Sequence, residues 1–234
     1  MRITSALLLI VLANATLLNA QTLKKGVVTD IDGNTYQTVE IGKYEWMAEN
    51  LRVTKYNNGA EISNIIDNNA WLNLKSGAHC WYENDKNNAE KFGALYNWYA
   101  VNTGNLCPDG WRVPSDEEWK YLEGYIDTKY GINDTIWNLT KSRGYNVAQH
   151  LKATNGWGTG YNGSNDVGFS AFPCGERTSK GKFLLIGQNG FWWSRTTYDS
   201  SRAWYRSMIY LTEKTLRDTH PKIMGFSVRC LKDK

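Results

Sequence analysis

Alternating apolar and polar residues near the start of the chain predict a β-hairpin. Residues 27–29 and 36–41 alternate in this way, and the segment between them reads Asp-Ile-Asp-Gly-Asn, with Gly33 directly after Asp32. An Asp-Gly pair supplies the positive φ angles that a tight hairpin turn requires. Residues 43–50 are expected to add a further strand.

One helix has a clear start further along the chain. Ser115 is a favourable N-cap residue, and Glu118 stands three positions later, where it completes a capping box. The apolar residues that follow have helical spacing, which predicts a single buried stripe. They are Trp119, Leu122 and Ile126.

The polar residues of this helix are expected to serve the helix itself. Asp116 and Glu117 lie in its first turn, where the helix dipole favours negative charge. Lys120 and Glu123 lie away from the apolar stripe and are expected to face water. The acidic residues are therefore explained without a catalytic role.

The remaining segments predict mostly antiparallel β hairpins and long loops. Residues 54–92 are rich in Asn, Gly and Lys, so irregular structure is expected there, and Asn146 is expected to cap a second short helix. After Gly168, short apolar runs separated by Gly, Asn, Asp and Ser predict a meander of strands. These runs cover residues 169–176, 182–186, 191–195, 203–211, 215–218 and 225–231. Together the segments predict an α+β fold in a single compact domain.

Residues 1–20 are typical of a secretory signal. Met1-Arg2 gives a positive start, residues 6–12 form an apolar run, and Leu18-Asn19-Ala20 has the small residues of a cleavage site. We therefore expect export to the periplasm, cell surface or medium, with residues 21–234 as the single mature domain. No apolar stretch approaches the roughly 20 residues that span a bilayer, so no transmembrane segment is expected.

The composition favours a globular protein and argues against nucleic acid as a partner. Of the 234 residues, 41% are hydrophobic and 13% aromatic, which is enough for a core. The formal net charge is only +4, and the basic residues are scattered along the chain. Scattered charge of this size does not provide the basic patch that nucleic acid requires.

The four cysteines favour disulfides over a metal site or a catalytic thiol. Cys80, Cys107, Cys174 and Cys230 form an even number in a chain expected to be exported, and from the residues alone three pairings are possible. No CxxC motif occurs and the histidines are far apart in the sequence, so zinc is not expected. The chain also lacks a GxSxG elbow, an HExxH helix and a complete P-loop, so no cofactor is expected.

The hairpin turn raises the question of calcium. Its Asp-x-Asp-Gly-Asn sequence also begins an EF-hand loop, but position 41, where that loop needs Glu, is Ile. A plain turn is therefore the favoured interpretation. The sequence leaves open whether Asp32 or Asp166 holds calcium.

Aromatic residues beside polar loops indicate a candidate ligand surface. Aromatic rings stack on the apolar faces of ligands such as sugars, while nearby polar groups bind the hydroxyls. Because neighbours in a strand point to opposite faces, one of Trp192 and Trp193 is expected in the core and the other at a groove. The candidate ligand-binding residues are Trp157, Tyr161, Asp166, Arg177 and Trp192. The competing interpretation is that most of these tryptophans fill the core of a loop-rich fold.

A series of short motifs runs in order along almost the whole chain. They are Val28-Thr29-Asp30-Ile31-Asp32-Gly33-Asn34-Thr35-Tyr36, Trp46-Met47-Ala48-Glu49-Asn50-Leu51, Gly93-Ala94-Leu95-Tyr96-Asn97-Trp98, Cys107-Pro108-Asp109-Gly110-Trp111-Arg112-Val113-Pro114-Ser115 with Glu118-Trp119, Gly168-Phe169-Ser170-Ala171, Trp193-Ser194 and Gly225-Phe226-Ser227-Val228-Arg229-Cys230. From about residue 27 to 233 the series resembles the Fibrobacter succinogenes major paralogous domain family. That family is found in exported and cell-surface proteins, notably of Bacteroidetes and Fibrobacter.

The resemblance brings expectations about the fold and the disulfides. The helix start at Pro114 and the terminal Gly-Phe-Ser-Val-Arg-Cys motif also resemble the formylglycine-generating enzyme and C-type-lectin-like superfold. This wider resemblance implies a compact α+β unit whose last strand returns beside the early ones, with function in the long loops. The enzyme's paired catalytic cysteines have no counterpart here. We expect Cys107 to pair with Cys230, and Cys80 with Cys174 if a second bridge forms.

These observations favour a non-catalytic binding module of the cell envelope or surface that recognises a glycan or a surface protein. The loop of residues 155–177 and the neighbouring aromatic residues are expected to contact the ligand. A structural or assembly subunit of the cell surface is the main alternative. An enzyme related to the formylglycine-generating enzymes is a third, and it would require a bound metal or a reactive thiol.

Overall fold

The computed structural model describes residues 23–233. The signal predicted at residues 1–20 therefore lies outside the described residues. Within residues 23–233, no helix has the length and apolar character needed to cross a membrane.

The N-terminal hairpin begins a five-stranded sheet, as the sequence predicts. β1 (Lys25–Thr29) pairs antiparallel with β2 (Thr35–Ile41), which pairs antiparallel with β3 (Tyr44–Met47). The sheet continues with β14 (Leu231–Lys232) and β7 (Trp111–Arg112), because Leu231 pairs with both β3 and β7. The last strand thus returns beside the early ones, which confirms the expectation drawn from the resemblance.

Asp30 fixes the turn of this hairpin. Its carboxylate accepts hydrogen bonds from the backbone N–H groups of Asp32 and Asn34 and from the Tyr36 hydroxyl. Gly33 adopts a φ of 83°, which glycine tolerates because it has no Cβ. The sequence therefore encodes this turn locally, and the predicted Asp-Gly hairpin is confirmed.

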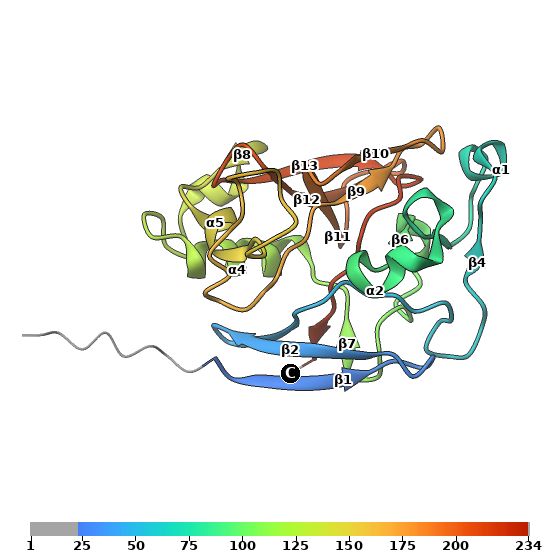
Figure 1. Ribbon diagram of the computed structural model, residues 1–234, viewed down its shortest axis with the longest axis horizontal. Helices are drawn as coiled ribbons and strands as arrows, with labels where there is room; N and C mark the ends of the chain where they lie inside the picture. Colours follow the sequence, from blue (N-terminus) through green and yellow to red (C-terminus); the bar gives the residue numbers. More distant parts are fainter. Residues whose placement is uncertain (1–22, 234) are drawn as a thin grey trace, which may run out of the picture.

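The C-terminal half forms a six-stranded sheet in the order β10-β9-β11-β12-β13-β8. Its neighbouring strands are antiparallel, apart from β9 and β11, which meet in parallel at Gly175 and Gly190. The strands are β8 (Lys141–Arg143), β9 (Cys174–Arg177), β10 (Phe183–Ile186), β11 (Asn189–Thr197), β12 (Arg202–Ile209) and β13 (Thr215–Pro221). In Figure 1 this sheet lies along the top of the view and the N-terminal hairpin along the bottom.

Two of the strands predicted in this half are largely wrong. Residues 169–176 contribute only part of β9, and residues 225–231 contribute only the first residue of β14. The second segment makes isolated bridges instead, which pair Gly225 with Arg177, Phe226 with Tyr96 and Ser227 with Trp192. Because it meets three different neighbours one residue at a time, it cannot form a continuous ladder.

The helices are short and connect the sheets. α4 (Asp116–Ile126) starts at Ser115 with both hydrogen bonds of the predicted capping box. α5 (Val147–Leu151) follows Asn146 as expected, but the Asn146 side chain accepts a hydrogen bond from the Thr128 N–H instead of capping the helix.

The other helices are α1 (Asn68–Leu72), α2 (Ala89–Phe92), α3 (Trp98–Val101) and the 3-10 helices η1 (Tyr82–Asn84), η2 (Lys86–Asn88) and η3 (Thr135–Asn138). Short strands within residues 63–96 form a third sheet: β4 (Ser63–Asn64), β5 (Ala78–Cys80) and β6 (Leu95–Tyr96). This arrangement confirms the predicted α+β class.

The core is built from aromatic side chains that lie between these layers. Trp46 packs against Trp119 and Phe169, with ring centroids 5.1 Å and 5.9 Å away. On the other side of the six-stranded sheet, Trp193 packs against Phe226 at 4.4 Å. These contacts confirm that the tryptophans mostly fill the interior of the fold.

One of the two expected disulfides is present. Cys107 and Cys230 are bonded and join residues 123 positions apart, which ties the segment before β7 to β14. Cys80 and Cys174 are unpaired and buried, so the second bridge does not form. The two thiols occupy different packing environments, because Cys80 lies in the cluster around Trp71 while Cys174 contacts Asn50.

Candidate functional site

Three of the five predicted ligand-binding residues lie in the interior of the protein. Trp157 is 5% exposed and its Nε1 donates to the Ala171 carbonyl oxygen at 2.9 Å. Trp192 is fully buried, and its Nε1 donates to Asn50 Oδ1 at 2.9 Å. Trp193 is fully buried as well, because β11 is covered on both faces. The expectation that one of these neighbours lines a groove is therefore wrong.

Arg177 is the third interior residue. Its guanidinium donates to the carbonyl oxygens of Gly181, Ile65 and Ile66, and it lies 4.3 Å from the centre of the Trp71 ring. These contacts hold the segment before α1 and the turn between β9 and β10 against β9. Arg177, Trp157 and Trp192 are thus structural residues of this fold and do not form an exposed ligand surface.

The other two predicted residues are exposed, and neither lines any of the pockets described below. Tyr161 is 42% exposed and packs edge-on against Tyr210, with ring centroids 5.1 Å apart. Asp166 lies 2.8 Å from His150 Nδ1. The structure therefore brings neither residue together with Trp157, Trp192 or Arg177 at a common surface.

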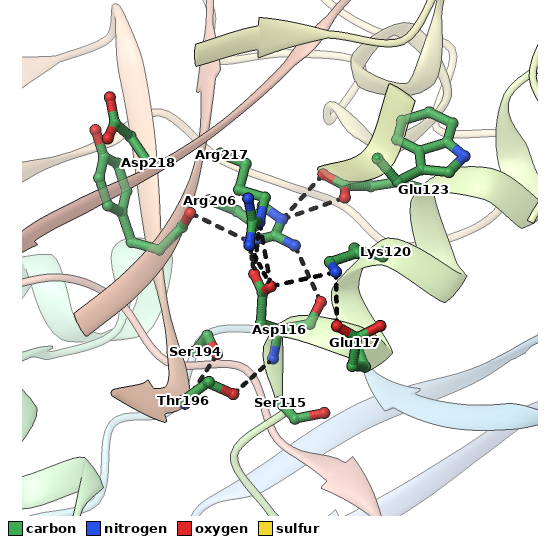
Figure 2. A network of polar contacts seen from close by, with 12 residues as sticks. Ser115, Asp116, Glu117, Lys120, Glu123, Ser194, Thr196, Arg206, Arg217 and Asp218 are labelled. Atoms are coloured by element: carbon green, nitrogen blue, oxygen red, sulfur yellow. Dashed lines mark hydrogen bonds and ion pairs between the residues drawn. The ribbon is translucent and has the colours of Figure 1, made fainter. Parts of the chain in front are cut away.

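Asp116 and Glu123 of α4 belong to a buried ionic network (Figure 2). Asp116 lies 2.7 Å from both Arg206 Nη1 and Arg217 Nη2. Glu123 accepts hydrogen bonds from Arg206 and Arg143 and is only 1% exposed. The prediction that Glu123 faces water is therefore wrong, because three arginines from β8, β12 and β13 converge on this side of the helix.

The network holds α4 against the six-stranded sheet. Burial by itself would raise the pKa of Asp116, but hydrogen bonds from Arg217 and Arg206 outweigh it and lower the pKa to about 2. Both oxygens of Asp116 and of Glu123 accept from arginine nitrogens. Both carboxylates are therefore fully engaged by arginines of the sheet, which are partners that the helix dipole alone does not predict.

The two unpaired thiols are shielded from solvent. Burial raises the pKa of Cys174 to about 11 and that of Cys80 to about 12. Both thiols are thus protonated at neutral pH. A thiolate is the nucleophilic form of cysteine, so neither residue has the properties of a catalytic thiol.

Two pockets lie between the N-terminal hairpin and α2, and they share Glu90 as a wall. The turn pocket has a volume of about 600 Å³ and is lined by Asp32, Asn34, Arg52, Thr54, Trp81, Lys86, Asn87, Ala89 and Glu90. The Arg229 pocket has a volume of about 370 Å³ and is lined by Gln37, Ala48, Glu49, Asn50, Glu90, Lys91, Ser170, Phe172 and Arg229. We call the two together the paired pockets. Figure 1 shows α2 facing β2, and both elements contribute lining residues, Gln37 from β2 and Glu90 from α2.

The floor of the Arg229 pocket is a hydrogen-bonded pair, Asn50 and Arg229. Arg229 Nε donates to Asn50 Oδ1 at 2.7 Å, and the same oxygen accepts from Trp192. Asn50 Nδ2 donates to the Phe92 carbonyl oxygen and to Cys174 Sγ, both at 2.9 Å. Asn50 therefore connects β3, α2, β9 and β11, and it fixes the orientation of Arg229.

Three further donors of Arg229 bind backbone carbonyl oxygens. Nη1 donates to Met47 and Phe169, and Nη2 donates to Ser170 at 2.9 Å. Arg229 is 1% exposed, and its guanidinium lies 4.4 Å from the centre of the Phe169 ring. Burial lowers the pKa of Arg229 to about 9, so the side chain is positively charged at neutral pH.

The turn pocket carries no metal-binding constellation. Asp30 is occupied by the turn, and Asp32 Oδ2 accepts from the Thr54 N–H and hydroxyl at 2.6 and 2.8 Å. Across residues 23–233, no group of three or more His, Cys, Asp or Glu side chains is arranged to hold a metal ion. These contacts support the plain-turn interpretation of the Asp-x-Asp-Gly-Asn sequence.

A third hollow, of about 560 Å³, lies beside α4 and includes Tyr44 and Tyr121. The ammonium group of Lys43 lies 5.2 Å and 4.5 Å from the centres of these two rings. The rings therefore already have a cationic neighbour over their faces. The paired pockets are the better candidate site, because their floor is formed by buried polar side chains of fixed orientation.

The paired pockets could be foreseen only in part from the sequence. Asn50, Ser170 and Arg229 each belong to one of the motifs that carried the resemblance, but they are separated by up to 179 positions. Nothing in the local pattern shows that these motifs meet. The aromatic residues, which gave the stronger sequence signal, lie mostly in the core instead.

The family model of the Fibrobacter succinogenes major domain matches residues 39–232. The chain belongs to this family, as the motifs predicted, and membership suggests a surface-associated domain. The match includes Ala48, Asn50, Ser170 and Arg229, whereas the hairpin turn precedes it. No curated protein and no solved structure matches the chain.

Proposed function

We propose that this protein is an exported, non-catalytic binding module of the cell envelope or surface, and that the paired pockets hold a glycan. The observation that carries the proposal is the pair of pockets that share Glu90. Together they offer amide, carboxylate, hydroxyl, ammonium and guanidinium groups beside Trp81 and Phe172. Such a mixture suits sugars, whose hydroxyl groups need polar partners and whose C–H faces need apolar contact.

The non-catalytic part of the proposal is supported by the state of the reactive side chains. The thiols of Cys80 and Cys174 are buried and protonated, and the carboxylates of Asp116 and Glu123 are engaged by arginines. These two thiols and two carboxylates are thus committed to structure. Binding is the activity that the paired pockets can perform without them.

A structural or assembly role remains the second candidate, because an apolar surface lies at one edge of the six-stranded sheet. Ile66 and Leu184 are 62% and 44% exposed and line the same wide hollow. Leu184 belongs to β10, which is the edge strand. An exposed apolar edge strand favours contact with another chain.

The test is binding of the purified protein to a panel of plant, host and bacterial polysaccharides, with calcium and with a chelator. The proposal predicts saturable binding to at least one member of the panel. Binding should weaken when Lys86 and Asn87, two exposed residues of the turn pocket, are both replaced by Ala. Tyr161→Ala serves as the matched control, because Tyr161 is exposed but lies outside the paired pockets.

Each possible result separates the alternatives. Loss of binding in Tyr161→Ala but not in the double variant would move the site to the 155–177 loop. Loss of binding with chelator would assign a role to calcium. No binding to any polysaccharide, together with self-association that is abolished by Leu184→Lys, would favour the assembly role and overturn the proposal.

A further inference from the structure

Arg229 differs from the three buried arginines of the α4 network. Arg143, Arg206 and Arg217 each contact a carboxylate of α4. Within residues 23–233, Arg229 has no carboxylate within ion-pair distance, and its acceptors are the Asn50 amide and three backbone carbonyl oxygens. Its positive charge is therefore solvated by dipoles but is not neutralised.

Glu49, the carboxylate that influences the pKa of Arg229, already has other partners. Its Oε2 lies 3.3 Å from Arg52 Nη1, and its Oε1 accepts a hydrogen bond from the Gln37 N–H at 2.7 Å. Glu49 thus acts on Arg229 only at longer range, where it partly offsets the effect of burial on the Arg229 pKa. The charge of Arg229 has no counter-ion of its own in the described chain.

One N–H donor of Arg229 also has no acceptor within residues 23–233. A guanidinium has five N–H donors, and the bonds to Asn50, Met47, Phe169 and Ser170 use four of them. The remaining hydrogen is on Nη2. Because Arg229 lines the pocket while its other bonds fix the guanidinium plane, this donor has a preset direction.

Arg177 shows that neutral acceptors alone do not make a site. It too binds carbonyl oxygens without a carboxylate, but it is covered by Trp71 at 4.3 Å and Phe183 at 5.0 Å, and it lines neither of the paired pockets. Arg229 is distinguished by the combination of an uncompensated charge, an unused donor and an adjoining cavity.

The other groups around the pocket define what an anion would meet. Lys91 adds a second positive charge at the rim, and Gln37 and Ser170 add neutral polar groups. Ala48 and Phe172 supply apolar contact. Glu90 stands at the boundary with the turn pocket, and Glu49, which also lines the Arg229 pocket, is paired with Arg52. A negatively charged group is therefore favoured beside Arg229 and Lys91, and a neutral, hydroxyl-rich part beside Glu90.

We propose that the Arg229 pocket recognises the carboxylate of an acidic sugar, so that the ligand of the module is a uronic-acid-containing polysaccharide. This inference rests on the proposed function and names its ligand class. The free guanidinium donor and the rim ammonium can each make a charge-assisted hydrogen bond, and these two bonds suit the two oxygens of a single carboxylate. A densely sulfated polymer would instead bring excess negative charge against Glu49 and Glu90.

The experiment compares one polymer with and without its charge. The purified protein is titrated at about 0.15 M salt, where surface charge is screened beyond roughly 8 Å, with polygalacturonic acid and with its fully methyl-esterified form. Dextran sulfate is the third arm. The proposal predicts that esterification weakens binding about tenfold or more, as expected for loss of a hydrogen bond to a charged group.

Variants locate the effect in the pocket. Lys91→Gln should weaken binding of the acid several-fold and leave binding of the ester unchanged. Asn50→Asp keeps the acceptor for Arg229 but adds a carboxylate beside it, so it should abolish the preference for the acid. Lys214→Gln removes an exposed positive charge far along the chain from both pockets and should have no effect. If Asn50→Asp does not fold, Lys91→Gln provides the test alone.

The outcomes distinguish this inference from the proposed function. Equal binding of acid and ester, lost in the turn-pocket variants, would overturn the acidic ligand and retain the glycan site. Tightest binding to dextran sulfate that does not respond to Lys91→Gln would indicate unspecific polyanion binding and would also overturn it. Binding to no polymer would overturn both.

Discussion

The α4 side of the protein and the Arg229 pocket both bury arginine, but they supply it with different partners. Beside α4, three arginines share the carboxylates of Asp116 and Glu123, so each positive charge has a negative partner. Arg229 donates hydrogen bonds only to an amide oxygen and to backbone carbonyl oxygens, and it lines a cavity. The first arrangement fixes two elements together and leaves no charge to offer. The second keeps a charge available to a ligand.

This difference explains why the acidic residues of α4 are not the site although they are the most charged segment of the chain. The carboxylates of Asp116 and Glu123 are buried and hydrogen-bonded on both oxygens by arginines, so they are not presented to a ligand. A buried guanidinium without a counter-ion carries the cost of desolvation, which an anionic ligand would relieve. The comparison can be tested by changing each side separately.

The largest effect is expected from Glu123→Gln. This change leaves Arg143 and part of Arg206 buried without their carboxylate, and breaking a buried ion pair in this way costs about 3–5 kcal/mol. The free energy of unfolding, measured by urea denaturation, should fall by that amount. Glu117→Gln on the same helix is the control, because the Glu117 side chain is 79% exposed, and its effect should stay within about 0.5 kcal/mol. Equal effects of the two changes would contradict the charge-balanced network.

A smaller loss is expected from Asn50→Ala. The change removes the acceptor shared by Trp192 and Arg229 and the donor to Cys174, so buried polar groups lose partners at about 2–3 kcal/mol in total. No ion pair is broken, which is why the loss should be below that of Glu123→Gln. Urea denaturation of both variants under the same conditions decides the order. A loss below about 0.5 kcal/mol would show that Asn50 does not organise the pocket.

Acid should weaken the α4 side in a defined pH range. The folded-state pKa of Asp116 is about 2, below its ordinary value of 3.8, so its contribution is complete above pH 3.8 and is lost as the pH falls toward 2. The shift corresponds to about 2 kcal/mol. Unfolding free energies measured between pH 5 and pH 2 should show this decrease, and Asp116→Asn should flatten it. An unchanged slope in Asp116→Asn would contradict the assignment.

The smallest effect on stability is expected from Lys91→Gln. Lys91 is exposed and has no ion pair within residues 23–233, so the free energy of unfolding should change by less than about 0.5 kcal/mol. Thermal unfolding and urea denaturation should both give values close to those of the unchanged protein. A loss above about 1 kcal/mol would mean that Lys91 is part of the fold, and its use as a binding probe would fail.

The sequence predicted those parts of the fold that depend on neighbouring residues. The Asp30 turn and the Ser115 capping box involve residues a few positions apart, so their chemistry is visible in a short window. Glu123 lies away from the apolar stripe of the helix, which predicts that it faces solvent. Its partners Arg143 and Arg206 are 20 and 83 positions away, and no local pattern reveals them.

The candidate site could not be predicted from the sequence for the same reason. Strand alternation suggested that Trp192 or Trp193 lines a groove, but β11 is covered on both faces, so both are buried. Asn50 and Arg229, which form the floor of the pocket, are 179 positions apart. The motifs that contain them identified the family, yet only the structure shows that they touch.

The most direct test of the central claim is a crystal structure of the protein with an oligogalacturonate. The account predicts that a sugar carboxylate accepts a hydrogen bond from Arg229 Nη2 at about 2.7–2.9 Å, with the neighbouring sugar extending past Glu90 into the turn pocket. A sugar bound at the Tyr161 surface or beside α4, with no ligand at Arg229, would contradict it.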